Sequence, residues 1–396
     1  MGGVLEGVRV LDFGRYIAGP FCATMLADMG AEVIRIEKTN GSEDRFILPI
    51  GGENNDIGAG FLQIGRNKKC LTLNPMKPEG REIVKKLVAT ADVVVANLPI
   101  PTLKAMGIDY DSLKAIKEDI ILTMVSAFGV DGPYNERVGF DLLGQAMSGA
   151  MDASGEADEP MRTQVPYVDF GTALFAAFGT MAALIERGKS GKGQMVEASL
   201  FSTSLAFNNA LLMEQALLET GRKARKNMGF HSAPNDVYRT QDGWIVLMVV
   251  GNPLFRRWAK LMGEDAWIDD PRFATDQARG DHGHLVSERM GAWCAKRTTQ
   301  QALDELEQAR VPAGPVFKAQ DALDDPHVKA RQLFKMLEYP GLSKPAPISD
   351  TPVRLSASET GIRHRAPLLG EHTDAIMQEL GFEAAEIESL RKAEVV

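Results

Sequence analysis

The stretch VRVLDFGRYIAGPFCATMLADMGAEVIRIE, residues 8–37, decides the fold. Its first six residues read as an apolar strand, residues 14–20 as a turn, and the following residues as a helix. Pro20 suits the first position of that helix, where a missing backbone N–H costs little. Residues 31–36 form a second apolar run, which ends at Glu37. The stretch therefore predicts a β-α-β unit with a right-handed crossover.

The same alternation continues along the chain. Strand-like runs at residues 70–73, 92–96 and 120–125 are separated by helical patterns at residues 79–90 and 112–118. Continuous apolar strands between helices are typical of a parallel sheet that helices cover on both faces. The sequence therefore predicts an α/β fold with a parallel sheet.

The pattern changes in the second half. Residues 170–187 read as one long buried helix, and a strand-like run at 195–200 and another helical run follow. The basic run at 222–226 has linker character, and residues 244–250 begin an α+β region. Because 396 residues exceed what one hydrophobic core usually organises, we expect two domains.

Charge and cysteine content exclude several classes of protein. A formal net charge of -9 argues against nucleic acid as a partner. The three cysteines, Cys22, Cys70 and Cys294, lie far apart and form no CxxC pair, so neither a disulfide framework nor a metal site is expected. The most apolar stretch, residues 170–185, is short for a membrane span, and no signal peptide is visible. We expect a cytoplasmic protein without metal or membrane contact.

The first β-α-β unit invites a nucleotide-binding interpretation. Glu37 ends the second strand, where dinucleotide enzymes place an acidic residue against a ribose. However, Gly14 and Gly19 are separated by four residues and do not form the G-x-G-x-x-G pattern. A structural turn is therefore favoured over NAD binding.

Asp169 precedes the long apolar helix and has two compatible interpretations. As an N-cap it would accept hydrogen bonds from free backbone amides. At a helix N-terminus its charged form is favoured, and a charged carboxylate can attack a thioester. Another open question concerns Arg66, Lys68 and Lys69, which are either a solvated loop or a seat for phosphate groups. The histidines have no metal-ligand spacing, and no Gly-x-Ser-x-Gly elbow or Walker loop is present.

Motifs along the whole chain resemble those of the family III CoA-transferases (CaiB/BaiF), which include formyl-CoA transferase. The matching segments are LEGVRVLDF (5–13), AGP (18–20), LADMGAEVIRIE (26–37), GRNKK (65–69), PEG (78–80), ADVVVAN (91–97), GFD (139–141) with Gln145, GKGQ (191–194), DPRF (270–273), VPAGPV (311–316) and APLLGEHT (366–373). Because they occur in order from end to end, the resemblance is specific.

The resemblance implies a Rossmann-like large domain with a parallel sheet and a smaller α+β domain. Residues 1–220 and the tail 329–396 would form the large domain, and residues 221–328 the small one. It also implies an interlocked homodimer, in which each chain threads its partner.

The resemblance further implies an acyl-transfer mechanism on Asp169. This residue would attack the donor thioester, form an aspartyl anhydride, and then carry CoA as an aspartyl-CoA thioester. Asp141 matches an acidic active-site residue of formyl-CoA transferase. Backbone amides near Asp169 or in the loop of Gly251 and Asn252 are expected to face the developing oxyanions.

Coenzyme A and its thioesters are then substrates, and no tightly bound cofactor is implied. The matched CoA-binding positions are Ile17, Ala18, Lys38, Leu73, Asn74, Asn97 and Leu98. Ala105 stands where many relatives have a phosphate-contacting arginine, so Lys104 or Arg137 is the candidate replacement. Ile17 stands where formyl-CoA transferase has a glutamine, which argues against oxalate or formate as acceptor. Arg15 and Tyr16 hint at a carboxylated substrate, and a small dicarboxylic acid is the guess for its identity.

Two alternatives remain open. The racemases of the same superfamily exchange an α-proton with a histidine in a Gly-His-Asp motif, which reads Gly139-Phe140-Asp141 here. Phenylalanine cannot exchange a proton, so the racemase reading is disfavoured. A non-catalytic CoA-binding protein is the other alternative, and the presence of Asp169 argues against it.

Overall fold

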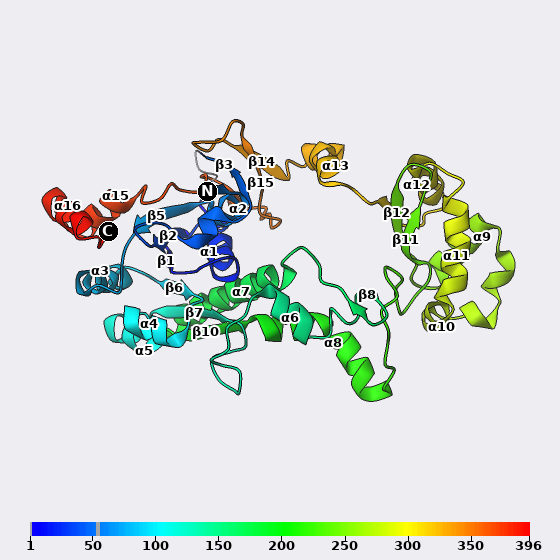
Figure 1. The fold of residues 1–396 in the computed structure, drawn as a ribbon, viewed down its shortest axis with the longest axis horizontal. Helices are drawn as coiled ribbons and strands as arrows, with labels where there is room; N and C mark the ends of the chain where they lie inside the picture. The colour runs from blue at the N-terminus through cyan, green and yellow to red at the C-terminus, as the bar shows by residue number, and fades with distance from the viewer. Residues whose placement is uncertain (1, 53–55) are drawn as a thin grey trace. The chain divides into compact units, whose positions relative to one another are not determined.

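Six parallel strands form the main sheet. They are β1 (Arg9–Asp12), β2 (Glu32–Glu37), β5 (Lys68–Thr72), β6 (Val93–Ala96), β7 (Ile121–Ser126) and β10 (Met195–Ser199), in the spatial order β10-β7-β6-β1-β2-β5. The computed structural model describes residues 2–52 and 56–396 of the chain (Figure 1). The predicted α/β fold with a parallel sheet is confirmed.

Helices cover both faces of this sheet. They are α1 (Ala18–Asp28), α3 (Pro78–Ala89), α4 (Ile100–Met106), α5 (Tyr110–Ile116), α7 (Tyr167–Ser190), α15 (Thr373–Glu379) and α16 (Ala384–Lys392). Helix α6 (Asp141–Met147) packs on α7, and α8 (Leu200–Leu218) follows β10 and is mostly exposed. Side chains alternate along each strand: Val10 packs towards α1 and α7, whereas Leu11 packs towards α3, α4, α5, α15 and α16. This alternation buries the strands on both faces.

Contacts within the chain divide it into two units. The first comprises the residues up to Ser148 together with Thr163–Met213 and Arg331–Val396, and the second comprises Gly149–Arg162 and Glu214–Ala330. The segments expected from the sequence, 1–220, 221–328 and 329–396, did not place residues 149–162 with the second unit.

The second unit has its own small sheet and core. Strands β11 (Asn235–Arg239), β12 (Trp244–Met248) and β13 (Ala313–Pro315) pair antiparallel, with α9 (Asn252–Met262), α10 (Asp276–Asp281), α11 (Gly283–Cys294) and α12 (Thr299–Gln308) around them. The short helices α13 (Ala319–Asp324) and α14 (Pro326–Ala330) follow in the chain, pack on each other and have no buried residues. Ile245 and Leu247 point into a core that contains Trp258 and Trp293. An α+β unit results.

Short elements complete both units. They are α2 (Ala59–Gly65), the single-turn helices η1 (Glu43–Phe46), η2 (Asp265–Ile268) and η3 (Pro271–Phe273), and the strand pairs β3 (Pro49–Gly51) with β4 (Ile57–Gly58), β8 (Gly155–Glu156) with β9 (Glu159–Pro160), and β14 (Phe334–Leu337) with β15 (Ala346–Ser349). Helix α15 packs beside β5, so C-terminal residues lie against N-terminal strands (Figure 1).

Two details of the helices differ from the sequence expectation. Helix α1 begins at Ala18, so Pro20 is its third residue rather than its first. Helix α7 is not buried all round, because Phe178 is 69% exposed and Ile185 63% exposed. Among the described helices, α7 alone is long and apolar enough to cross a membrane by length and composition, and 44% of its most apolar window is buried within the chain.

Candidate active site

The predicted CoA-binding residues meet at one edge of the main sheet. Ile17 and Ala18 follow β1, Lys38 follows β2, Leu73 and Asn74 follow β5, and Asn97 and Leu98 follow β6. In a parallel sheet all these strands end at the same edge. The strand order places β1 between β2 and β6, and the crevice at such a switch point is where open α/β sheets bind ligands.

Asn97 joins the ends of β6 and β1 through its side chain. Its Oδ1 accepts a hydrogen bond from Arg15 N at 2.7 Å, and its Nδ2 donates to Arg15 O at 2.8 Å. The next residue, Tyr16, has a positive φ of 60°, a strained conformation that this double bond helps to hold. Asn97 therefore acts on the β1–α1 turn directly.

The turn leads into a helix start without a side-chain cap. Ile17 occupies the N-cap position of α1, and no side chain accepts from the first-turn N–H groups. Arg15, which hinted at a carboxylated substrate, donates from Nη1 to the main-chain oxygens of Phe13, Gly14 and Ile36. This nitrogen braces the turn.

The other predicted positions differ in how open they are. Lys38 is half-exposed and pairs with Glu43. Leu73 is 1% exposed and Leu98 packs on the core, so both offer main-chain atoms more than side chains. Asn74 donates its N–H to Val395 O at 2.8 Å.

The two candidates for the missing arginine both lie on the surface. Lys104 is exposed on α4. Arg137 is exposed in the loop before α6, and its guanidinium lies 4.0 Å from the ring centroid of Tyr134. Neither side chain forms a buried ion pair with a described residue, so both are accessible to a phosphate group.

Asp141 and Asp169 lie together at the start of α7. Asp141 Oδ2 accepts from Val168 N at 2.7 Å and from Asp169 N at 3.1 Å, and both carboxylates are 8% exposed. Asp169 stands in the first turn of α7, after the N-cap position at Pro166. The N-cap prediction for Asp169 is therefore wrong, because Asp141 takes the backbone donors. The N–H groups of Val168 and Asp169 are consequently not free oxyanion donors either.

The charge state of Asp169 also differs from expectation. Burial, and then the neighbouring Asp141 charge, raise the pKa of Asp169 from its ordinary value to about 7. The helix terminus was expected to favour the charged form, but its donors are engaged by Asp141. Asp169 is thus a carboxyl group that titrates near neutral pH.

Gln145 supports Asp141 from the next turn of α6. Its Nε2 donates to Asp141 Oδ1, and its Oε1 accepts from Thr163 N at 3.0 Å. Sequence reasoning noted Gln145 only as part of a motif. The i,i+4 spacing from Asp141 on a helix was the available signal.

Aromatic contacts connect the turn to the two carboxylates. The rings of Tyr16 and Phe140 lie 5.2 Å apart, and those of Phe21 and Phe170 lie 4.8 Å apart, both edge to face. Phe140 immediately precedes Asp141, and Phe170 immediately follows Asp169. The β1–α1 turn and the carboxylate pair therefore belong to one site in the first unit.

The comparisons identify the family. Residues 5–373 match the family described as CoA-transferase family III. The chain belongs to CoA-transferase family III. It is 35% identical to succinyl-CoA–D-citramalate CoA-transferase of Chloroflexus aurantiacus, over 95% of this chain and 94% of that protein. It is 34% identical to succinate–glutarate CoA-transferase of Agrobacterium fabrum, over 95% of each.

Solved structures agree with this assignment. The crystal structure of a CAIB/BAIF family protein from Brucella suis is 33% identical and superimposes with a TM-score of 0.82, covering 96% of this chain and 100% of that one. The protein is a CoA-transferase.

The loop of Gly251 and Asn252 was expected to offer backbone amides to the developing oxyanions. Gly251 N, in the second unit, donates to both carboxylate oxygens of Asp276, at 2.9 and 3.0 Å. Asn252 Oδ1 accepts from Arg279 at 3.0 Å. The predicted role of this loop is therefore wrong for the Gly251 amide in this structure, because that donor is already paired.

Two of the three basic residues after α2 are neither part of a solvated loop nor a phosphate seat. Arg66 is 2% exposed and pairs with Asp28, the last residue of α1, at 2.8 Å. Lys68 is 3% exposed and pairs with Asp12 at 2.7 Å. Lys69 remains half-exposed beside Glu32. Both expectations are wrong for Arg66 and Lys68, because carboxylates far away in sequence reach them.

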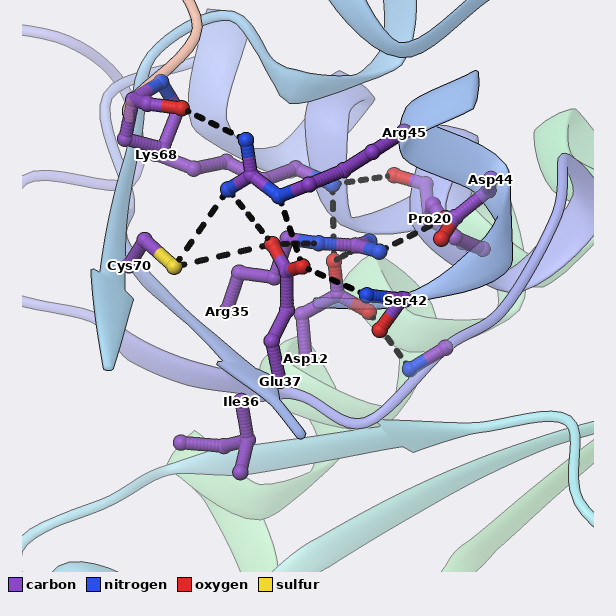
Figure 2. Close-up of polar contacts among 12 residues, drawn as sticks. Asp12, Pro20, Arg35, Ile36, Glu37, Ser42, Asp44, Arg45, Lys68 and Cys70 are labelled. Atoms are coloured by element: carbon purple, nitrogen blue, oxygen red, sulfur yellow. Dashed lines mark hydrogen bonds and ion pairs between the residues drawn. The ribbon is translucent and has the colours of Figure 1, made fainter. Parts of the chain in front are cut away.

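Glu37 belongs to a buried network of charges (Figure 2). Its oxygens accept from Arg35 Nε at 2.9 Å and from Arg45 Nε and Nη2 at 2.8 Å. It also accepts from Ser42 N at 3.2 Å. These cations lower the pKa of Glu37, against the effect of burial, to about 2. Glu37 thus holds the loop after β2, and a ribose has no access to it.

Two other features lie apart from this chemistry. A cavity of ≈ 840 Å³ opens at the amino ends of β2 and β5, where Glu32 pairs with Lys69 and Arg365 with Glu371. Asp169 does not line it, so geometry and chemistry favour the opposite edge of the sheet. Within residues 2–52 and 56–396, no three histidine, cysteine or acidic side chains gather in a way that could hold a metal ion.

Proposed function

We propose that this chain transfers CoA from succinyl-CoA to a short dicarboxylic acid, with Asp169 as the covalent carrier. The observation that carries the proposal is the position of Asp169: it is buried, has no cationic partner among residues 2–52 and 56–396, and lies next to the turn where the predicted CoA-binding residues meet. A buried carboxylate with a pKa near neutrality is a stronger nucleophile than an ordinary one. Relatives named for succinyl-CoA and for citramalate or glutarate support the donor and acceptor class.

The mechanism proceeds through four displacements at acyl carbon. An Asp169 oxygen attacks the thioester carbonyl, the C–S bond breaks, and CoA thiolate leaves with the electron pair. The thiolate then attacks Cγ of Asp169, which releases the donor acid as a carboxylate and leaves an aspartyl-CoA thioester. The acceptor carboxylate attacks the same Cγ and expels the thiolate again. Attack of the thiolate on the acceptor carbonyl then regenerates free Asp169, so no net proton is needed.

Asp141 fits this mechanism as the group that keeps Asp169 available. Because Asp141 accepts from the first-turn N–H groups of α7, the Asp169 oxygens do not turn back onto their own helix. Its negative charge also raises the basicity of Asp169. We therefore assign Asp141 an electrostatic and positioning role beside the carrier.

Coenzyme A is proposed to lie along the carboxyl edge of the sheet. Main-chain groups of Ile17 and Ala18 at the uncapped start of α1 suit an anionic group. Lys38 is the cation at this edge, after β2. Lys104 or Arg137 is proposed to supply the second cation in place of the missing arginine.

The racemase alternative finds no support at the matching position. Phe140 has no ionisable group, and its ring packs against Tyr16. A second proton carrier beside Asp169 is required for α-proton exchange. Deuterium uptake into a 2-methylacyl-CoA would be the result that revives it.

A second copy of the chain is proposed to cover the open face of α7. This face carries exposed apolar side chains, namely Leu174, Phe175, Phe178 and Ile185, and Phe207 on α8 is 51% exposed. Patches of this kind on a soluble enzyme mark interfaces. An interlocked homodimer is the arrangement that the family resemblance implies, and light scattering of Phe178→Asp against the unmodified protein tests it.

We propose a reducing, cytoplasmic compartment from the number and spacing of the three cysteines. Cys22, Cys70 and Cys294 are free thiols in the structure, and all are buried. Burial raises the pKa of the Cys22 thiol to about 12, which keeps it unreactive.

Intact-mass analysis tests the proposed function. The protein is incubated with succinyl-CoA, with and without hydroxylamine, beside Asp169→Asn. A succinyl or CoA adduct that hydroxylamine removes, and that the variant lacks, is the expected result. Turnover without any adduct, or an unchanged adduct on Asp169→Asn, would contradict covalent transfer through Asp169.

A further inference from the structure

Lys68 is a buried lysine at a strand position where an apolar residue would be the ordinary choice. It begins β5, and its side chain is 0% exposed. Nζ donates to Asp12 Oδ2 at 2.7 Å and to Pro20 O at 2.7 Å (Figure 2). Burying an ammonium group is costly unless it is paired and hydrogen-bonded, so both partners are needed to hold it there.

Both contacts of Lys68 touch the β1–α1 turn. Asp12 ends β1, and its other oxygen, Oδ1, accepts from Gly14 N at 2.8 Å. Pro20 lies in the first turn of α1. Lys68 therefore holds the two ends of the turn at once, while Asn97 holds its middle at Arg15.

Lys68 belongs to a buried set of charges. Arg35, Arg45 and Lys68 face Asp12, Glu37 and Asp44, and the partly buried Arg15 interacts with the same three carboxylates. Losing one member leaves an uncompensated charge, whereas losing a matched pair need not cost stability. Charge balance and geometry can therefore be separated by mutation.

Arg35 shows what would happen to the turn without Lys68. Its Nη1 is buried without a hydrogen-bond partner and lies 3.7 Å from Asp12 Oδ2. With Lys68 absent, this guanidinium nitrogen would be the donor next in line for Asp12 Oδ2, while Gly14 N still donates to Oδ1. A shift of Asp12 towards Arg35 would draw Oδ1 away from Gly14 N.

We infer that Lys68 is a positioning residue for CoA binding. By joining Asp12 to Pro20 it fixes the β1–α1 turn in the conformation in which the main chain of Ile17 and Ala18 can contact CoA. The inference rests on the proposed function, because it assumes that CoA lies over this turn. It assigns no contact between Lys68 and substrate, since the side chain is sealed from solvent.

The decisive variant removes the pair together. Lys68→Met with Asp12→Leu removes one buried cation and one buried anion together and fills similar volume, but takes the acceptor from Gly14 N and leaves Pro20 O with Thr24 as its side-chain donor. The matched control is Arg66→Met with Asp28→Leu, which removes the buried pair at the other end of α1. Each double variant replaces one buried ion pair by two apolar side chains. The two differ in whether that pair lies at the N-terminal or the C-terminal end of α1.

Calorimetric titration with free CoA and thermal unfolding are measured for all three proteins. We expect the Lys68 and Asp12 double variant to be folded and to show a single unfolding transition. Its dissociation constant for CoA should rise on the order of tenfold, which corresponds to about one lost hydrogen bond between CoA and the β1–α1 turn. The control variant should keep the unmodified dissociation constant. Equal CoA affinity in both double variants would overturn the inference.

A milder variant covers the case in which the double variant does not fold. Lys68→Arg keeps the charge, but its planar guanidinium cannot reproduce the two short bonds from a single nitrogen. We expect weaker CoA binding at a nearly unchanged melting temperature, and wild-type affinity in this variant would count against the inference. If the unmodified protein bound no CoA at all, the proposed function itself would fail, and that result is read before any variant is compared.

Discussion

Asp141 Oδ2 accepts the backbone N–H of Asp169 at 3.1 Å, so the helix that carries the proposed nucleophile is capped from a neighbouring helix. This relationship places two carboxylates side by side, and neither has an ion-pair partner among the described residues. Burial first, and this neighbouring charge second, explain why the pKa of Asp169 is raised although the residue stands in the first turn of a helix. The predictions below begin from this pair.

Adduct formation should depend on pH through Asp169. Its pKa of about 7 means that the attacking carboxylate is scarce below neutral pH and abundant above it. We expect the rate of adduct formation with succinyl-CoA to rise roughly tenfold per pH unit below pH 7 and to level off above it. Single-turnover rates between pH 5 and 9 measure this, and a flat profile would contradict it.

Replacing Asp141 by asparagine should move this profile. The substitution removes the charge that contributes to the raised pKa of Asp169, while the side-chain oxygen can still accept from α7. We expect the midpoint to fall by about one pH unit. Asp141→Ala is the control: it also loses the cap and should cost about 1 kcal/mol of unfolding free energy.

Asp169→Asn should stabilise the fold at alkaline pH. A raised folded-state pKa means that the native state holds the proton more tightly than the unfolded state does, so ionisation costs stability as pH rises from about 4 through 7. The variant cannot ionise and should melt higher than the unmodified protein at pH 8. At pH 4 the two should melt alike, and a difference there would point to lost packing instead.

Asn97→Ala should weaken CoA binding through the turn. The substitution removes both bonds to Arg15 and leaves Tyr16 without this restraint. We expect the dissociation constant for CoA to rise on the order of tenfold, with a smaller effect on the adduct-forming step once CoA esters saturate the site. Asn97→Asp keeps the acceptor for Arg15 N but loses the donor to Arg15 O, so its dissociation constant for CoA should lie between those of the unmodified protein and Asn97→Ala.

Two glycines near the C-terminal end of α7 should respond to alanine in opposite ways. A Cβ at Gly193 would lie 2.0 Å from Ile120 O, so Gly193→Ala must displace either the segment that leads into β10 or the residues just before β7. We expect a loss of about 2 kcal/mol or more in unfolding free energy. Gly188 is exposed within α7 and meets nothing within 4 Å, so Gly188→Ala should gain up to about 1 kcal/mol. Urea denaturation of both variants decides the matter.

The sheet could be predicted because its signals are local. Each apolar run that was read as a strand, such as residues 31–36 or 120–125, lies within a residue or two of an observed strand. Asp169 was also found locally, by its place at the start of an apolar helix. The capping of its helix was missed because Asp141 lies 28 residues away, and its raised pKa was missed because burial, its main cause, and the Asp141 charge both come from the folded chain.

Burial of charges was the other feature beyond reach of the sequence. Arg66 and Lys68 look like surface residues, and only the fold brings Asp28 and Asp12 across to them. The open face of α7 was expected to be buried for a related reason. An apolar residue that its own chain covers and an apolar residue that stays exposed, such as Phe178, are of the same type in the sequence. Composition cannot tell which surface will cover them.

The core of the first unit is closed by residues from both ends of the sequence. Met377, Ile387, Val395 and Val396 share one buried cluster with Leu11, and Val395 O accepts the N–H of Asn74 beside β5. During synthesis the early strands must therefore wait, with one apolar face uncovered, until residues 373–396 have emerged from the ribosome. A chain without this tail would expose that apolar face, which is the kind of surface that chaperones bind. We expect a protein shortened before residue 373 to accumulate in this incompletely folded form.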